Sequence, residues 1–229
     1  MNAPPIAWEE LSEWTRSAAL RLPVLPSFAE ARSVDPRVLF RELGYTFWNQ
    51  ELLDTLSARL RGEGVARWVE LAAGTGRWAA ELARRGLPVV ATDDYSQAPE
   101  RVRSNQRPIL YGEWVARMPA AEAVRHLHPE GVLCAWPPLG SGLIPDLLSG
   151  AMPGAEVARV IVCIGEPGGA TEAPIAPTEI SLPWRLETWP ECERYLTGFN
   201  DPPAGPEGES NSRLWIYRRA PWGPHEGSV

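Results

Sequence analysis

The sequence contains no lysine, and all 22 of its basic residues are arginine. A chain without lysine cannot form a Schiff base through an ε-amino group, and it cannot supply the lysine of a phosphate-binding P-loop. Acidic residues outnumber basic ones by 29 to 22, which gives a net charge of −7. Nucleic-acid-binding proteins usually carry a basic surplus that neutralises phosphates, so this balance argues against a nucleic-acid partner.

Cysteine is scarce as well, with three widely separated residues, Cys134, Cys163 and Cys192. An odd number without a CxxC pair predicts reduced thiols, and we expect neither a disulfide framework nor a metal site. Long hydrophobic runs are also missing, because the longest, near residues 160–164, is far too short to span a bilayer. The first ten residues lack the basic and apolar regions of a secretion signal. These absences predict a cytoplasmic protein without a membrane partner.

The first 64 residues instead carry the apolar periodicity and the end signals of helices. The predicted helices cover residues 8–22, 36–43 and 51–61. Asp35 is suited to cap the second helix and Gly44 to end it, while Asn49 is suited to cap the third. We therefore expect a helical N-terminal region, residues 1–64, packed on the remaining chain as a cap.

From residue 65 the pattern changes to alternating strands and helices. Strands are predicted at residues 68–72, 88–92, 108–111, 131–136 and 159–165, and helices at 77–85, 120–127 and 143–148. Such alternation with continuous apolar strands is typical of a parallel sheet covered on both faces. Two further strands, 184–189 and 213–218, have no predicted helix between them and favour an antiparallel hairpin at the sheet edge. The predicted fold class is α/β: a Rossmann-like, mostly parallel sheet with a C-terminal antiparallel hairpin over residues 65–220. The tail, residues 221–229, is expected to be disordered.

The segment between the first predicted strand and its helix is Glu70-Leu71-Ala72-Ala73-Gly74-Thr75-Gly76. Glycines at such a turn leave no Cβ in the way of a ligand, and the following helix presents backbone N–H donors. The next predicted strand ends in Asp93 and Asp94, 19 and 20 residues after Gly74. A carboxylate at that place can accept hydrogen bonds from ribose hydroxyls, and we favour Asp93 because it closes the strand.

Two nucleotide-binding patterns compete for this loop. Gly74, Gly76 and Ala79 satisfy the dinucleotide fingerprint GxGxxG/A, which is a weak match on its own. The loop more closely resembles the first motif of class I SAM-dependent methyltransferases, acidic-x-Gly-x-Gly-x-Gly, with Ala72 at the place of the first glycine. An acid in the loop would repel a pyrophosphate and suits the ammonium group of S-adenosylmethionine (SAM). The resemblance implies that SAM is bound by Glu70, Ala72, Gly74, Thr75, Gly76, Asp93 and Asp94.

The segment after the fourth predicted strand should reach the carboxyl edge of the sheet, where open α/β sheets bind ligands. Trp136-Pro137-Pro138 is similar to the Asp/Asn-Pro-Pro-aromatic motif of amino-methylating enzymes. Trp136, however, replaces the residue that grips the amine, and Leu139 replaces the stacking aromatic. Indole has a donor and no acceptor, so that chemistry is not transferred to this chain. Trp136 and Pro137 are candidates for the wall of an aromatic substrate pocket, with structural packing as the equal alternative.

Two other segments carry candidate site residues. Glu166 ends the most apolar predicted strand, where a partly desolvated carboxylate could act as a general base, although hydrogen bonding to its own loop is slightly favoured. Tyr45 and Trp48 precede the helix that leads to the glycine loop, and they are candidates for closing over the cofactor or substrate, or for an aromatic plug. Together with Trp-Pro-Pro and Gly-Glu-x-x-Gly-Gly-x-Thr, this pattern is similar to a poorly characterised bacterial methyltransferase-like group.

The resemblance implies a SAM-dependent methyltransferase that transfers a methyl group to O or N of a small molecule, with specialised metabolism as one candidate setting. Methyl transfer needs mainly alignment, plus a base when the nucleophile carries a proton, so the lack of a strong catalytic signature is compatible with it. Two alternatives stay open. One is a non-catalytic SAM- or nucleoside-binding protein with a regulatory or scaffold role, and the other is an NAD-dependent oxidoreductase. The oligomeric state is left open.

Overall fold

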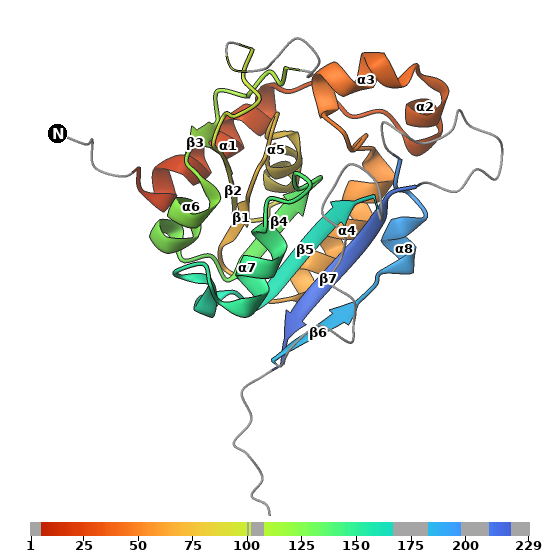
Figure 1. The fold of residues 1–229 in the computed structure, drawn as a ribbon. Coiled ribbons are helices and arrows are strands. Elements are labelled where there is room, and N and C mark those ends of the chain that lie inside the picture. The colour runs from red at the N-terminus through yellow and green to blue at the C-terminus, as the bar shows by residue number, and fades with distance from the viewer. Residues whose placement is uncertain (1–5, 100, 102–107, 167–182, 198–210, 221–229) are drawn as a thin grey trace, which may run out of the picture.

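The computed structural model describes residues 6–99, 101, 108–166, 183–197 and 211–220, which form one seven-stranded sheet with helices on both faces (Figure 1). The strands are β1 (Trp68–Glu70), β2 (Val89–Asp93), β3 (Val115–Arg117), β4 (Gly131–Ala135), β5 (Val160–Gly165), β6 (Trp184–Glu187) and β7 (Arg213–Arg219). Their order is β3-β2-β1-β4-β5-β7-β6. The first five in this order run parallel, and β7 runs antiparallel to both β5 and β6. The predicted fold class is therefore confirmed.

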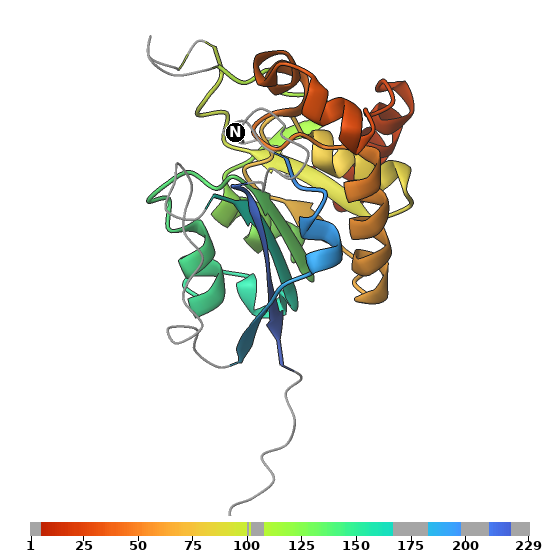
Figure 2. The ribbon, with the colours of Figure 1, turned by 90° about the vertical axis from the view of Figure 1, so that its right-hand side faces the viewer.

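The helices are α1 (Trp8–Arg21), α2 (Phe28–Ser33), α3 (Pro36–Leu43), α4 (Gln50–Gly62), α5 (Arg77–Arg84), α6 (Ala120–Leu127), α7 (Leu143–Ser149) and α8 (Pro190–Glu193). Residues of α4, α5 and α8 pack into one apolar cluster against the sheet, and residues of α6 and α7 pack into a second. Figure 2 shows these layers on opposite sides of the twisted sheet. Among the described residues, no helix has both the length and the hydropathy that crossing a bilayer requires.

Capping side chains fix the helix boundaries that the sequence predicts. Asp35 accepts a hydrogen bond from the backbone of Arg37, and Gly44, with φ of +81°, closes the same helix, α3. Asn49 Oδ1 accepts from the backbone N–H of Leu52 at 2.9 Å and so caps α4. The Asn49 amide also donates to Tyr195 O at 2.8 Å, which ties the start of α4 to the C-terminal part of the chain.

The strand predicted at residues 108–111 is wrong, and the third strand is instead Val115–Arg117. Within this segment Ile109 contacts the region of Gly74, the Tyr111 ring stacks on Tyr95 with centroids 3.9 Å apart, and Leu110 is exposed. The true strand has only three residues, too few for a visible alternation pattern. It forms because its backbone pairs with the end of β2.

The C-terminal strands also differ in detail from the prediction. The short helix α8 lies between β6 and β7, where none was expected, and it buries Cys192 completely. β7 is an inner strand between β5 and β6, so of these two C-terminal strands only β6 lies at an edge of the sheet. Helix α2, also not predicted, begins with a capping box between Ser27 and Glu30.

Helix α1 is an integral part of the core. It packs against α5 and β2, beside a β2–β3 connection in which the described residues contain no helix (Figure 1). Leu11 joins the apolar cluster of one face, and Ala19 joins the cluster of the other. The guanidinium groups of Arg77 and Arg84 donate to backbone carbonyls at the end of α1, including Leu22 O at 2.7 Å. The N-terminal region thus completes the layer beside β2.

Candidate functional site

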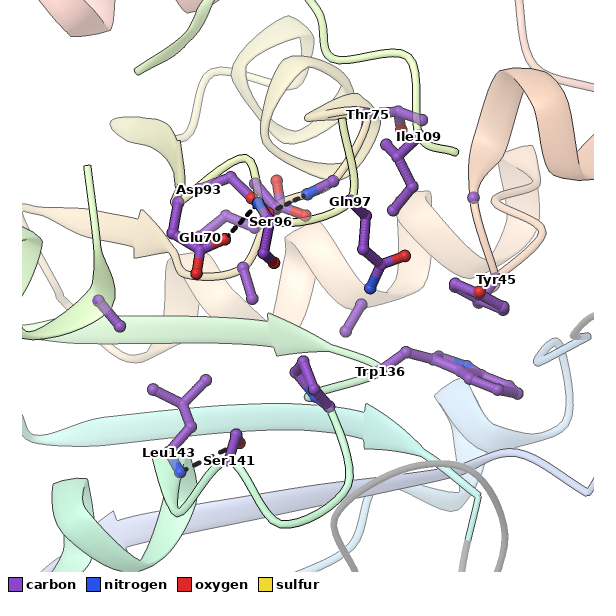
Figure 3. Close-up of a pocket in the computed structure, with 18 of the residues that line it drawn as sticks. Tyr45, Glu70, Thr75, Asp93, Ser96, Gln97, Ile109, Trp136, Ser141 and Leu143 are labelled. Atoms are coloured by element: carbon purple, nitrogen blue, oxygen red, sulfur yellow. Dashed lines mark hydrogen bonds between the residues drawn. The ribbon is translucent and has the colours of Figure 1, made fainter. Parts of the chain in front are cut away.

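A cavity of about 330 Å³ lies at the carboxyl ends of β1, β2 and β4, where the winding of the sheet reverses (Figure 3). This is the place where open α/β sheets bind ligands. The predicted site residues that line it are Tyr45, Trp48, Glu70, Ala72, Gly74, Thr75, Asp93, Asp94 and Trp136. Three others, Gly76, Pro137 and Glu166, are not among the described residues that line it. The fold therefore assembles most of the predicted site from four separate segments.

The glycine loop turns by means of residues with positive φ. Gly74 has φ of +54° and Gly76 of +69°. Ala72, at the place where the related motif has glycine, also has φ of +50°. The left-handed conformation costs a residue with a Cβ about 1–2 kcal/mol. The loop conformation is therefore held by its surroundings and not by local preference at Ala72.

The two glycines of the loop have different tasks. A Cβ on Gly74 would stand 3.5 Å from Ile109 Cδ1, an ordinary contact, and Gly74 lines the cavity. A Cβ on Gly76 would stand 2.4 Å from Val115 Cγ2 and 2.7 Å from Trp114 Nε1, far inside contact distance. The Trp114 indole also donates to Gly76 O at 2.9 Å. Gly76 thus makes room for the residues at the start of β3, whereas only Gly74 leaves room for a ligand.

Glu70 ends β1 beneath the loop and is only 3% exposed. Its Oε2 accepts a hydrogen bond from the backbone N–H of Ala79 in α5 at 2.8 Å. Burial raises the pKa of Glu70 to about 8, against the lowering effect of that hydrogen bond and with a further contribution from the nearby Asp93 carboxyl. The carboxyl is therefore poised to ionise when a cation enters the cavity.

Asp93 and Asp94 both line the cavity but are held differently. Asp93, 7% exposed, accepts hydrogen bonds from the backbone N–H groups of Gly74 at 2.9 Å and Tyr95 at 2.7 Å. Burial raises its pKa despite these bonds and a further one from the Tyr111 hydroxyl. Asp94 is exposed, and its Oδ1 accepts from Ser96 N at 2.7 Å. Asp93 thus fastens the glycine loop to the end of β2, and Asp94 projects beyond it.

Aromatic rings form the end of the cavity that lies away from Glu70 and Asp93 (Figure 3). Tyr45 stacks on Trp136 with ring centroids 5.0 Å apart, and Phe40 meets Tyr45 edge-on at 4.8 Å. Figure 3 shows the two stacked rings side by side at this end. Trp48 is 2% exposed and stacks on Trp78, so most of its ring belongs to the core beneath the cavity. The aromatic wall therefore consists chiefly of Tyr45 and Trp136.

The prediction did not include Gln97. Figure 3 shows its amide inside the cavity, between the Asp93 end and the stacked rings. Its backbone is fixed on both sides, because its N–H donates to the Tyr111 hydroxyl at 3.2 Å and its carbonyl accepts from Ile109 N at 2.9 Å. No local pattern marks such a residue, since the connection that carries it is irregular and is positioned by tertiary contacts such as the Tyr95–Tyr111 stack.

The cavity is one-sided in charge. Four carboxyl groups line it, those of Glu70, Asp93, Asp94 and Asp146, and its described lining includes no arginine or histidine. Arg37 lies in an adjoining apolar groove and is paired with Asp35 at 2.8 Å. This lining of carboxyl acceptors therefore suits a ligand that carries positive charge and offers hydroxyl or amino groups as donors.

No model of a known protein family matches the sequence, and no curated protein matches it. Similar solved structures include magnesium protoporphyrin IX methyltransferase from Synechocystis PCC 6803 with bound SAM, at 14% identity and a TM-score of 0.41, over 96% of this chain and 100% of that one. A SAM-dependent methyltransferase from Archaeoglobus fulgidus matches at 14% identity and a TM-score of 0.39, over 73% of this chain and 94% of that one. The 1,6-didemethyltoxoflavin-N1-methyltransferase of Burkholderia thailandensis matches at 19% identity and a TM-score of 0.37, over 96% of this chain and 93% of that one. Such scores describe a distant likeness, and the chemistry must come from the site itself.

Proposed function

We propose that this chain is a SAM-dependent methyltransferase that acts on a small molecule, with transfer to O or N as the reaction class. The single observation that carries the proposal is the cavity at the sheet reversal, where the glycine loop meets four carboxyl groups and no described basic residue. SAM carries a sulfonium and an ammonium group, and its ribose offers two hydroxyls. Its size also suits a cavity of this kind, which falls in the range of small-molecule sites.

Each part of the lining has a task in this proposal. Gly74 lets the methionyl part approach the loop, since no Cβ projects there. Asp94 accepts hydrogen bonds from the ribose hydroxyls, because Asp93 is already engaged by the backbone of Gly74 and Tyr95. Glu70 contributes negative charge beneath the loop when it ionises. Bound SAM supplies an electrophilic methyl group, and the protein's residues supply alignment and exclude water from the buried end.

The main alternative is a protein that binds SAM without turning it over. Glu166, the candidate base of the sequence analysis, is buried after β5 and does not belong to the described cavity lining, and this favours the alternative. An NAD-dependent oxidoreductase is less well supported, since a pyrophosphate would meet carboxyl groups and no described arginine.

Calorimetric titration with SAM, S-adenosylhomocysteine and NAD⁺ tests the proposal. Saturable binding of the first two with no detectable heat from NAD⁺ is the expected result, and tight NAD⁺ binding without SAM binding would overturn it. Mass spectrometry for S-adenosylhomocysteine, after incubation with SAM and a panel of amines and phenols, then separates the enzyme from the non-catalytic binder.

A further inference from the structure

The charge of the cavity restricts the acceptor as well as the cofactor. An anionic acceptor would enter a space lined by four carboxyl groups without a described cation to receive it. Burial raises the pKa values of Glu70 and Asp93, and the neighbouring carboxyl of Asp93 adds to the first and that of Asp94 to the second, so the environment of both groups already disfavours negative charge. A neutral or cationic acceptor meets no such penalty.

The aromatic end of the cavity restricts the acceptor's shape. Tyr45 and Trp136 present ring surface and ring edges there, and their mutual stack fixes their orientation. Aromatic walls bind flat, apolar rings well, and they also attract cations through the negative faces of the rings. A planar aromatic acceptor that carries or gains positive charge therefore fits this end best.

The carboxyl groups of the cavity also restrict the reacting atom. A phenol or carboxylic acid must lose its proton to become a good nucleophile, and the resulting anion would be repelled by the lining. The described lining contains neither Glu166 nor a histidine, so only its carboxyl groups could take that proton, and the anion formed would lie among them. A neutral nitrogen, in contrast, already carries the lone pair that the reaction needs.

We propose that the acceptor is an uncharged or cationic aromatic amine or nitrogen heterocycle, methylated on nitrogen, and that the Gln97 amide orients it. This inference rests on the proposed function. The acceptor's neutral nitrogen uses its lone pair to form the new N–C bond, while the C–S bond breaks and its electron pair stays on sulfur. The positive charge of the sulfonium passes to the nitrogen, where the carboxyl groups of the lining stabilise it until any proton is lost. Where the nitrogen carries a hydrogen, its proton leaves to solvent after transfer.

Gln97 is suited to this task by its place and its chemistry. Its amide lies between the Asp93 end and the aromatic end of the cavity (Figure 3). The amide oxygen can accept an N–H bond from the acceptor, which turns the nitrogen lone pair away from Gln97. The backbone bonds of Gln97 to Tyr111 and Ile109 hold the residue in place without using this amide.

A series of bicyclic aromatic ligands of similar size and different charge tests the inference by equilibrium binding. The probes are 1-naphthylamine, 4-aminoquinoline and 1-naphthoate, titrated calorimetrically into protein saturated with S-adenosylhomocysteine. Both amines are expected to bind at least about tenfold more tightly than the carboxylate. The advantage of the cationic 4-aminoquinoline should shrink as salt rises from about 0.05 M to about 0.5 M, because salt screens the carboxyl charges.

Substitutions at Asp146 and Gln97 test whether these residues cause the preference for amines over the carboxylate. Asp146→Asn should reduce the preference for 4-aminoquinoline severalfold, whereas Glu122→Gln removes the same charge from the exposed side of α6 and should change nothing. Gln97→Met keeps the length of the side chain and removes the carbonyl, so both amines should bind more weakly while SAM affinity is kept.

Two results would overturn the inference. One is 1-naphthoate binding as tightly as the amines, and the other is a methylated product that carries the new group on oxygen. Both are read in protein that binds SAM. If the unmodified chain does not bind SAM at all, the proposed function is refuted instead. Failure of the acceptor inference and failure of the proposed function are therefore distinguishable.

Discussion

The ring of Tyr45 lies parallel to the indole of Trp136, with an angle of only 14° between their planes. Tyr45 belongs to the N-terminal region, and Trp136 directly follows β4. The backbone of Trp136 is held in the left-handed region with φ of +57°, and its backbone N–H donates to Ile164 O in β5 at 2.7 Å. The stack therefore joins the N-terminal region to the sheet edge at the cavity, so that the site depends on both parts of the chain.

The first prediction concerns this stack. Tyr45→Ala should lower the free energy of unfolding by about 0.5–1.5 kcal/mol beyond the loss of buried area, the usual worth of an aromatic pair. It should also weaken acceptor binding and leave SAM affinity unchanged. Tyr45→Phe keeps the ring and should behave like the unmodified chain. Urea unfolding and calorimetry measure the two effects, and a Phe variant as damaged as the Ala variant would show that the hydroxyl matters and the stack does not.

The second prediction separates the two loop glycines. Gly76→Ala should destabilise the fold by about 1–3 kcal/mol, since its Cβ would overlap the side chains of Trp114 and Val115. Gly74→Ala meets only an ordinary contact with Ile109 and should cost less, chiefly through its left-handed backbone. Gly74→Val should then lose SAM affinity in a folded protein. Chemical denaturation and calorimetry on all three variants test this, and equal stability of the two alanine variants would contradict it.

The third prediction assigns different roles to Asp93 and Asp94. Asp93→Ala leaves the backbone N–H groups of Gly74 and Tyr95 without their acceptor and should cost about 1–3 kcal/mol of stability. Asp94→Ala should leave the melting temperature nearly unchanged and reduce SAM affinity instead. Thermal unfolding and SAM titration of the two variants provide the test. If Asp93→Ala is stable and loses SAM, Asp93 itself holds the ribose, as the strand end alone would suggest.

Sequence patterns predicted those helices and strands whose boundaries are set by residues close to them in the sequence. Asp35, Gly44 and Asn49 act within their own helix ends, so their residue types suffice to predict α3 and α4. The β2–β3 connection could not be predicted in this way. Ile109 and Tyr111 look like strand residues, yet their partners are the glycine loop and Tyr95, which tertiary structure alone brings to them.

The site follows the same division. The positions of Glu70, Gly74 and Asp94 at the cavity were predictable, because a strand, a turn and a helix follow one another in order along the chain. Gln97 and Asp146 come from an irregular connection and from α7, and their presence in the cavity depends on packing. The sequence likewise could not distinguish Gly76 from Gly74, because the side chains that need the space at Gly76 are Trp114 and Val115, nearly forty residues away.

The last prediction concerns pH and Glu70. Its pKa rises from 4.5 in the unfolded chain to about 8 in the folded one, because burial opposes ionisation. Between these values the folded state holds a proton that the unfolded state has released, so this group makes stability fall as pH rises from about 4.5 to about 8. The melting temperature of the ligand-free protein should therefore drop by several degrees across this window. Glu70→Gln keeps a carbonyl acceptor for Ala79 N and should remove most of the slope, leaving a smaller part from Asp93, whose pKa is also raised.

SAM should show the opposite dependence on pH, because its positive charge favours the ionised form of Glu70. Its affinity should rise between about pH 6 and pH 8, and binding near neutral pH should release a proton. Calorimetry in two buffers of different ionisation enthalpy measures that proton directly. A SAM affinity that is flat over this range in the unmodified chain, and identical in Glu70→Gln, would mean that the Glu70 carboxyl stays protonated beneath the loop and serves only to hold α5 in place.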